Sequence, residues 1–159
     1  MAVFHLAQVN VARLVAPLDS PQLAGFVSRL DEVNALADGA AGFVWRLTGD
    51  GGNDATAVPI YEDDRIIVNL SVWESIEALR AFTYSGAHLE VYKQRRAWFS
   101  LMKEASMVMW WVPAGHRPDV AEARDRLAHL RAHGPSPHAF VFGAPFPPPA
   151  DTIEVRPEA

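Results

Sequence analysis

The feature that most constrains the fold is an alternating stretch from Ile66 to Trp73 that runs directly into a helical pattern. Every second residue of a β-strand points to the same face of the sheet. One face of this strand is purely apolar, and the other mixes apolar and polar groups: Ile66, Val68, Leu70 and Val72 against Ile67, Asn69, Ser71 and Trp73. An apolar cavity needs a few placed hydrogen-bonding groups to orient a ligand. We therefore interpret the mixed face as the floor of a pocket. The alternative is an antiparallel strand with one face in water.

The first predicted strand, Val3–Arg13, carries the same mixture. One of its faces combines Phe4 and Leu6 with the amides of Gln8 and Asn10. If the two mixed faces lie on the same side of one sheet, Gln8 and Asn10 line the same cavity as the polar groups of the later strand. The alternative, which stays open, is that these amides lie at the solvated end of a strand.

The order of the remaining patterns indicates the fold class. A helical stripe begins near Pro21 and ends at Gly39, and further strands are predicted over 42–47 and 106–113. The order strand, helix, strand, strand, helix, strand is that of the ferredoxin-like α+β fold, βαββαβ with an antiparallel sheet. A helix after Asp119 and a short strand over 139–142 extend it. We predict a single domain over residues 1–143 and a Pro-rich C-terminal tail over residues 144–159.

The strand from Ser106 to Pro113 is apolar on both faces, which indicates burial on both sides. In the predicted fold, helices cover one face of the sheet and nothing covers the other. That leaves too much exposed apolar surface for a stable monomer. We therefore expect a homodimer, sheet against sheet, through the face that bears Trp111 or Trp110.

Composition and charge exclude several classes of function. The chain has 159 residues, a net charge of −5 without charge runs, and no cysteine, so a nucleic-acid footprint and thiolate chemistry are not indicated. No signal peptide and no membrane-length apolar run are visible. We expect a soluble, cytoplasmic protein whose partner is a small molecule, with no nucleic acid or membrane partner. His129, His133 and His138 are spread over a helix end and a loop, so we predict no metal site.

A family resemblance begins at Asn69. The chain has Asn69, then Trp73-Glu74-Ser75 after three residues, and Ala78 two residues later. This pattern resembles the strand-to-helix junction of the antibiotic-biosynthesis monooxygenases, cofactor-free oxidases of aromatic polyketides. The resemblance implies a dimeric α+β barrel with a cavity in each protomer, between sheet and helices, and an uncharacterised bacterial branch of that superfamily. The tyrosine that follows this Ala in quinone-forming members is Leu79 here.

Haem-degrading enzymes share this scaffold, and aligning them with the chain tests for a cofactor. Their Trp falls on Phe82 and their haem-ligating His falls on Tyr92. We therefore expect no cofactor. A tyrosinate can ligate ferric haem, so haem binding is chemically allowed, but haem degradation by that route is not expected.

A second helix, predicted from about Ala87, places His88, Tyr92, Arg95 and Phe99 on one face. Such a group can transfer a proton and bind an anion, with Lys93 or Arg95 stabilising the negative charge. The alternative is a core stripe whose basic heads lie in water. Asn34 lies one turn past Leu30 on the earlier helix, and we interpret it as a buried residue bonded to backbone.

Together with the resemblance, these features predict a cofactor-independent monooxygenase-like enzyme that acts on an aromatic or polyketide-like small molecule in secondary metabolism. The predicted catalytic residues are Asn69, Trp73, His88 and Tyr92. The predicted substrate-binding residues are Gln8, Asn10, Ser71, Phe82, Lys93 and Arg95. Two other hypotheses stay open: a non-oxidative cyclase or isomerase on the same scaffold, and a non-enzymatic protein that binds haem or an apolar metabolite.

Overall fold

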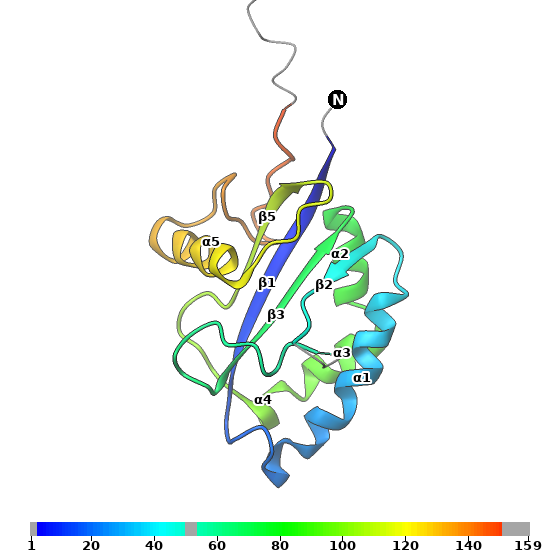
Figure 1. Cartoon of the computed structure of the whole chain (residues 1–159), viewed down its shortest axis with the longest axis vertical. Coiled ribbons are helices and arrows are strands. Elements are labelled where there is room, and N and C mark those ends of the chain that lie inside the picture. Colours follow the sequence, from blue (N-terminus) through cyan, green and yellow to red (C-terminus); the bar gives the residue numbers. More distant parts are fainter. Residues whose placement is uncertain (1–2, 50–53, 151–159) are drawn as a thin grey trace, which may run out of the picture.

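A computed structural model describes residues 3–49 and 54–150 of the chain. Its centre is an antiparallel sheet (Figure 1), built around the long strand β1 (Phe4–Leu14). On one side β1 pairs with β3 (Ile66–Trp73), which pairs with β2 (Phe43–Arg46). On the other side β1 pairs with β5 (Met107–Pro113) and, at its end, with β4 (Phe99–Ser100). The predicted ferredoxin-like α+β fold is confirmed.

The helices follow the predicted order, with one correction. They are a 3-10 turn at Pro21–Leu23, α1 (Ala24–Asp38), α2 (Ile76–Thr83), α3 (Gly86–Lys93), α4 (Arg95–Trp98) and α5 (Val120–His133). Ser75 caps α2 by accepting a hydrogen bond from the Ala78 N–H, as expected for a helix N-cap. The prediction that one helix continues through Phe99 was wrong. Helix α3 ends at Lys93, and Phe99 joins the sheet opposite Leu14. Pairing with β1 and edge-on packing of the Phe99 ring on Phe26 outweigh the helical periodicity.

The register of β1 and β3 brings the two mixed faces together. Gln8 lies opposite Ser71, and Asn10 lies opposite Asn69. Directly opposed residues of neighbouring strands share a face of the sheet. The condition under which Gln8 and Asn10 line the same cavity as the polar groups of β3 is therefore met.

Both faces of the sheet are covered within the chain, contrary to the prediction that one face lacks a cover. Helices α1 to α4 lie over the mixed face, and α5 lies over the apolar face (Figure 1). The apolar stripe of α5, with Ala123, Leu127 and Leu130, packs in one cluster with β5 residues such as Trp110. Trp110 is 0% exposed, and its indole N–H donates to Glu122 Oε2 of α5 at 2.8 Å. The stripe of α5 needs an apolar partner surface, and this sheet face supplies it.

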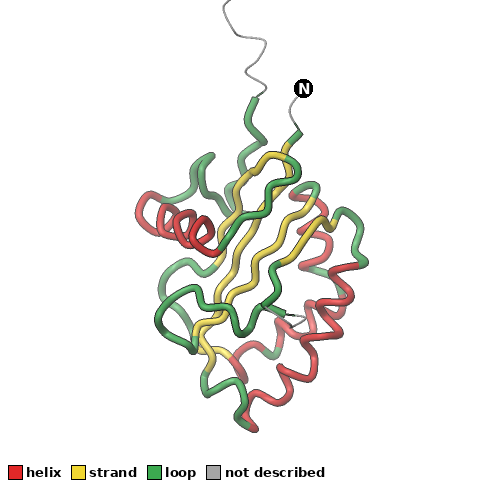
Figure 2. Tube along the Cα trace, in the orientation of Figure 1, coloured by secondary structure: helices red, strands yellow, loops and turns green. Residues whose placement is uncertain are grey.

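The connection between β2 and β3, a long loop in Figure 2, also covers the apolar face. Within its described part, 54–65, Ala55 and Ile60 are buried in the same cluster as α5. Arg124 of α5 fixes this loop from the helix side, because its Nη1 donates to the Ile60 carbonyl at 2.8 Å. Residues 54–65 are thus a packed part of the domain.

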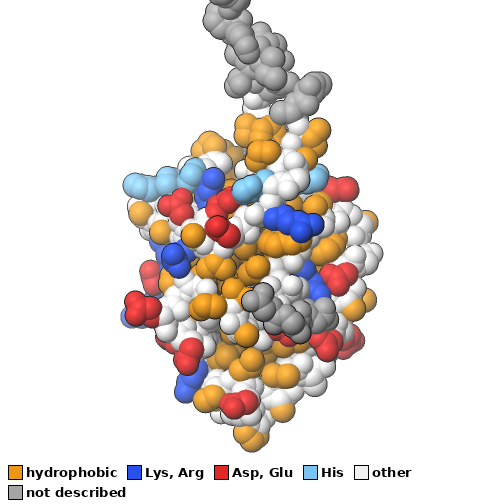
Figure 3. Space-filling model, in the orientation of Figure 1, with side chains coloured by type: hydrophobic (Ala, Val, Ile, Leu, Met, Phe, Trp, Pro, Cys, Tyr) orange, Lys and Arg blue, Asp and Glu red, His pale blue; other side chains and the backbone are white. Residues whose placement is uncertain are grey.

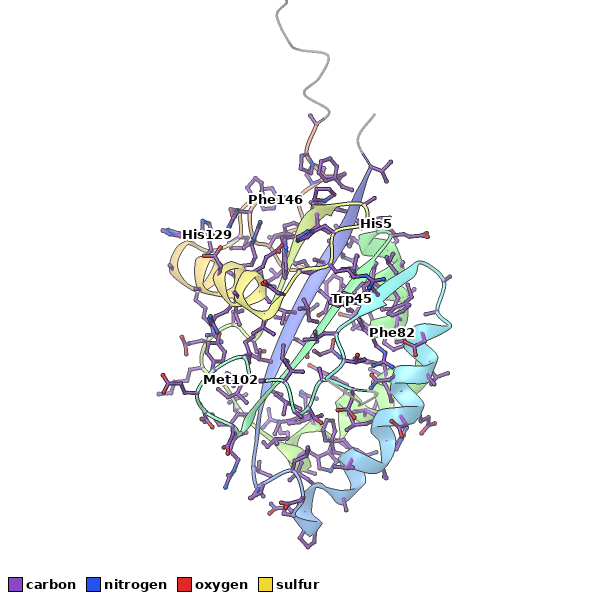
Figure 4. The ribbon with its side chains drawn as sticks, in the orientation of Figure 1. His5, Trp45, Phe82, Met102, His129 and Phe146 are labelled. Atoms are coloured by element: carbon purple, nitrogen blue, oxygen red, sulfur yellow. The ribbon has the colours of Figure 1, made fainter. Side chains whose placement is uncertain are left out.

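The C-terminal segment differs from the predicted short strand over 139–142. A single bridge forms instead, in which Met109 and Phe140 exchange two backbone hydrogen bonds of 2.8 and 2.9 Å. The chain turns on both sides of this bridge, because the Ala139 N–H donates to the Ser136 carbonyl at 3.1 Å and the Ala144 N–H to the Val141 carbonyl at 3.0 Å, so no longer ladder forms. The chain still packs back on its own sheet, since the Trp111 indole N–H donates to the carbonyl of Phe146, which is labelled in Figure 4. Residues 151–159 of the predicted tail lie outside the described residues, and the boundary at 143 stays a prediction.

Among the described residues, none of the helices combines the length and the apolar character needed to cross a membrane.

Candidate functional site

A cavity of about 690 Å³ lies between the mixed face of the sheet and helices α1 to α4. Nine of the ten predicted site residues line it: Gln8, Asn10, Asn69, Ser71, Trp73, Phe82, His88, Tyr92 and Arg95. Lys93 does not line it. This lysine is exposed at the end of α3, one residue and therefore about 100° around the helix from Tyr92. The structure thus brings together nearly all of the side chains that the sequence singles out, while their roles stay predictions.

A hydrogen-bonded row of polar side chains forms the cavity floor. The buried Gln8 donates from Nε2 to Asn69 Oδ1 at 2.8 Å and to Ser71 Oγ at 2.7 Å. Asn10 donates from Nδ2 to Gln8 Oε1 at 3.2 Å. Gln8 therefore fixes the orientation of the two β3 side chains beside it, and this network is preorganised rather than loose.

The network leaves hydrogen-bond donors for a ligand. Asn69 uses its Oδ1 toward Gln8, while its Nδ2 makes no hydrogen bond within the described part of the chain. Ser71 Oγ accepts from both Gln8 and Trp73, which leaves its own O–H hydrogen as a donor. Donors gathered at one place favour a ligand oxygen that carries, or develops, negative charge.

Trp73 contributes its ring to the cavity wall. The side chain is 1% exposed, and its indole N–H donates to Ser71 Oγ at 2.9 Å. The N–H is therefore satisfied inside the protein, and its predicted use toward a substrate oxygen requires that bond to break. Phe82, labelled in Figure 4, stacks on Trp73 at 5.4 Å between ring centroids, and His88 lies 5.3 Å beyond Phe82. Trp73, Phe82 and His88 form an aromatic row, suited to a planar ligand.

His88 is held in one tautomer. Its Nδ1–H donates to the Thr83 carbonyl at 2.9 Å, and since a carbonyl has only lone pairs, the proton must be on Nδ1. Nε2 then carries the free lone pair, and it makes no hydrogen bond within the described residues. Burial lowers the pKa of His88 below its ordinary value of about 6.5, although the bond to Thr83 acts in the opposite direction. The imidazole is therefore neutral at pH 7 and able to accept a proton at Nε2.

Four arginines line the cavity. The charged lining residues among those described are Arg29, Arg46, Arg95 and Arg96, with the carboxylate of Asp54, and two of these arginines are ion-paired, Arg29 with Glu32 and Arg46 with Asp38. The Arg95 guanidinium lies 4.0 Å from the centre of the Tyr92 ring and donates to the Tyr92 carbonyl at 3.0 Å. Tyr92 is 51% exposed. Arg95 and Arg96, on the short helix α4, have no ion pair with a carboxylate among the described residues, and their charge favours the anionic form of a bound ligand.

One lining residue was misinterpreted from the sequence. Asn34 of α1 lines the cavity and, within the described chain, makes no hydrogen bond to backbone or side chain, so the prediction of a backbone-bonded residue was wrong. Its signal in the sequence was a polar residue within an apolar helical stripe. A polar residue at such a position can be either a structural residue bonded to backbone or a residue that lines a cavity, and the sequence alone does not distinguish the two.

The C-terminal histidines approach more closely than the sequence suggests. The His129 ring lies 4.7 Å from the His133 ring and 4.6 Å from the His138 ring. Within residues 3–49 and 54–150, no group of three or more His, Cys, Asp or Glu side chains is arranged to hold a metal ion. The cavity is therefore the candidate functional site.

Comparison with solved structures finds similar chains of low sequence identity. PA3566 from Pseudomonas aeruginosa is 11% identical, with a TM-score of 0.48 over 73% of this chain and 99% of that chain. NE2512 from Nitrosomonas europaea, a protein of unknown function, is 11% identical, with a TM-score of 0.46 over 75% and 97%. SnoaB, a cofactor-independent oxygenase from Streptomyces nogalater, is 18% identical, with a TM-score of 0.42 over 72% and 95%.

No curated protein matches the chain. A family described as "Domain of unknown function (DUF3291)" matches it over residues 5–156. Since this match spans nearly the whole sequence, the chain belongs to the DUF3291 family.

Proposed function

We propose that the chain is a cofactor-independent monooxygenase-like enzyme that acts on an oxygen-bearing aromatic small molecule. The observation that carries this proposal is the composition of one cavity. A neutral histidine with a free Nε2 lines the same space as the Asn69 and Ser71 donors and an aromatic row. The resemblance of the Asn69–Ala78 motif to the antibiotic-biosynthesis monooxygenases supports the same reaction class.

The chemistry needs only binding, proton transfer and exclusion of water. His88 Nε2 removes a proton from the phenol or from the carbon next to a ring ketone. The resulting negative charge develops on the ligand oxygen, where the Asn69 N–H groups and the Ser71 O–H donate to it. An electron-rich aromatic anion can donate an electron to dioxygen. The reacting ring carbon forms a C–O bond to dioxygen, and the hydroperoxide takes back the proton held by His88. Cleavage of its O–O bond and of the C–H bond at that carbon releases water and leaves a carbonyl, so one oxygen atom enters the product and the substrate supplies all four electrons.

A second candidate function uses the same groups without oxygen. The histidine base and the floor donors also serve a cyclase or isomerase, because both reactions pass through an enolate-like anion. A haem-binding function has less support, since the exposed Tyr92 ring is stacked under the Arg95 guanidinium. Oxygen consumption distinguishes the first two functions.

We expect Asn69→Ala to reduce ligand affinity or turnover about 10- to 100-fold, because it removes a directed hydrogen bond of about 1–3 kcal/mol. Stability should fall only slightly, since the Gln8 N–H that loses Asn69 Oδ1 still has the Asn69 backbone carbonyl at 3.5 Å, and Gln8 keeps Ser71 Oγ. Titration with an aromatic ligand and a thermal melt measure the two effects separately.

Ser71→Ala is the matched comparison on the same strand. It removes the acceptor of two buried donors, Gln8 Nε2 and Trp73 Nε1, so it should lower the melting temperature more than Asn69→Ala, which removes one acceptor. Trp73→Phe tests the indole N–H while keeping the aromatic ring. A collapsed melting temperature in Asn69→Ala, with unchanged affinity in the folded fraction, would contradict a site role for Asn69.

We further propose that the protein is a cytoplasmic homodimer that acts in secondary metabolism. The dimer interface expected from an uncovered sheet face is not available, because α5 covers the face that bears Trp110. Beside α5, hydrophobic side chains still gather over the sheet (Figure 3), and Trp45, Val58 and Ile66 stay partly exposed there. We expect a dimer in analytical ultracentrifugation at micromolar concentration, and a monomer for Trp45→Glu. A wild-type chain that sediments as a monomer would remove the basis of this proposal.

A further inference from the structure

Resting on the proposed function, we infer that Asn34 of α1 is a ligand-binding residue, the helix-side partner of Asn69 on the cavity floor. The ligand that fits such a cavity is a planar aromatic molecule with hydrogen-bonding groups on two opposite edges. One polar group contacts the β3 side of the cavity and the other contacts α1.

Asn34 has no hydrogen-bond partner within the described part of the chain. Its side chain is only 9% exposed and lines the cavity. Within the described chain it makes no hydrogen bond, although the large majority of buried polar side chains in proteins have at least one partner. The amide atoms are not sealed off from solvent but open onto the cavity, so a ligand group can reach them and bond to them.

The second argument is the helical stripe on which Asn34 lies. Four of the other five α1 residues that line the cavity are apolar, Phe26, Leu30, Val33 and Ala37, and the fifth is Arg29, which pairs with Glu32. An apolar residue at position 34 would continue that stripe. Asparagine is also a poorer helix former than alanine or leucine. Neither packing nor helix propensity accounts for the residue.

The α1 wall and the β3 wall of the cavity each present an amide to a ligand. The Asn34 amide offers one acceptor and two donors, so it can bind a hydroxyl or a carbonyl. Asn69 offers its Nδ2 donors from β3, on the sheet side of the same cavity. Between these walls the row of Trp73, Phe82 and His88 provides flat aromatic surface. A cavity with an amide on each of two walls and aromatic rings between them fits a flat aromatic ligand that carries a polar group on each of two opposite edges.

The test compares two naphthalene probes by isothermal titration calorimetry. 1,5-Dihydroxynaphthalene carries hydroxyls on opposite edges, and 1-naphthol carries one hydroxyl. The wild type should bind the diol about tenfold more tightly, the effect of one hydrogen bond. Asn34→Ala and Asn34→Leu should both abolish that preference and leave 1-naphthol affinity unchanged. Asn69→Ala should weaken both probes.

The melting temperature of the Asn34 variants is a second readout. If Asn34 had a structural role, both variants would melt at a lower temperature than the wild type. Removing an amide that has no partner within the described chain should leave the melting temperature of both Asn34 variants close to that of the wild type. A wild type that binds both probes equally, or Asn34 variants that melt lower and lose both probes alike, would overturn the inference. In either case a continuing effect of Asn69→Ala leaves the proposed function standing. Failure of the wild type to bind either probe would overturn both.

Discussion

Replacing His88 by glutamine is expected to lower kcat/KM by roughly 10²- to 10⁴-fold, the usual contribution of a positioned general base. Glutamine can still donate a hydrogen bond to the Thr83 carbonyl, so the turn between α2 and α3 should keep its structure. Nε2 of His88 is the free basic nitrogen of the imidazole, and no glutamine atom can replace it as a base. Steady-state rates and a thermal melt of the two proteins test this expectation.

The pH profile identifies the base more specifically. Burial lowers the pKa of His88, so the neutral, active form persists below pH 6.5. The wild-type rate should fall only as the pH drops through this lowered pKa, and His88→Gln should lack that acid limb. The stability of the folded state depends on pH in the same direction. The contribution of His88 is fully present above its unfolded-state pKa of about 6.5, and it is lost as the pH falls through the lower pKa of the folded state. A variant with a wild-type rate and an unchanged pH profile would exclude His88 as the base.

Gly42→Ala is expected to lower the free energy of unfolding by roughly 2–4 kcal/mol. Gly42 has a φ of 82°, which is unfavourable for residues with a side chain, and an added Cβ would lie 2.5 Å from the Ala78 Cβ. The Gly42 carbonyl also accepts from the Glu74 N–H at 2.7 Å, so β2 and the start of α2 are held together at this point. Urea unfolding measures the loss.

Gly86→Ala is the matched control, because an added Cβ at the start of α3 would meet nothing within 4 Å. It should change stability by no more than about 0.5 kcal/mol. In Gly42→Ala, a second change of Ala78→Gly should recover the part of the loss that comes from the clash. A Gly42→Ala variant as stable as the wild type would contradict the close contact between β2 and α2.

The strand patterns predicted the cavity floor because a strand has only two faces. Alternation placed Asn69 with Ser71 on one face of their strand and Gln8 with Asn10 on one face of theirs. Whether the two faces coincide depends on the register, which only the structure gives, with Gln8 opposite Ser71 and Asn10 opposite Asn69. The same argument could not assign hydrogen bonds. That Trp73 donates to Ser71, two residues earlier on its own strand, depends on side-chain rotamers that periodicity does not specify.

The helices were harder to predict, because their faces depend on what they pack against. The stripe of α5 was visible in the sequence, but the sequence did not show that it covers the sheet face assigned to a second protomer. The sequence also allowed a helix through Phe99, which tertiary pairing converts to strand. Asn34 required the opposite wall of the cavity before its missing partner could be recognised.

The most direct test of the proposed function is the fate of dioxygen with anthrone, whose tautomer is a phenol. Conversion to anthraquinone consumes one O₂ and releases one water, so the added oxygen atom can be traced. Under ¹⁸O₂, with protein dialysed against a chelator, we expect one ¹⁸O atom in the quinone, at a rate that depends on His88 and Asn69. Quinone without ¹⁸O, or a rate equal to that of the uncatalysed solution, would contradict the proposed monooxygenase.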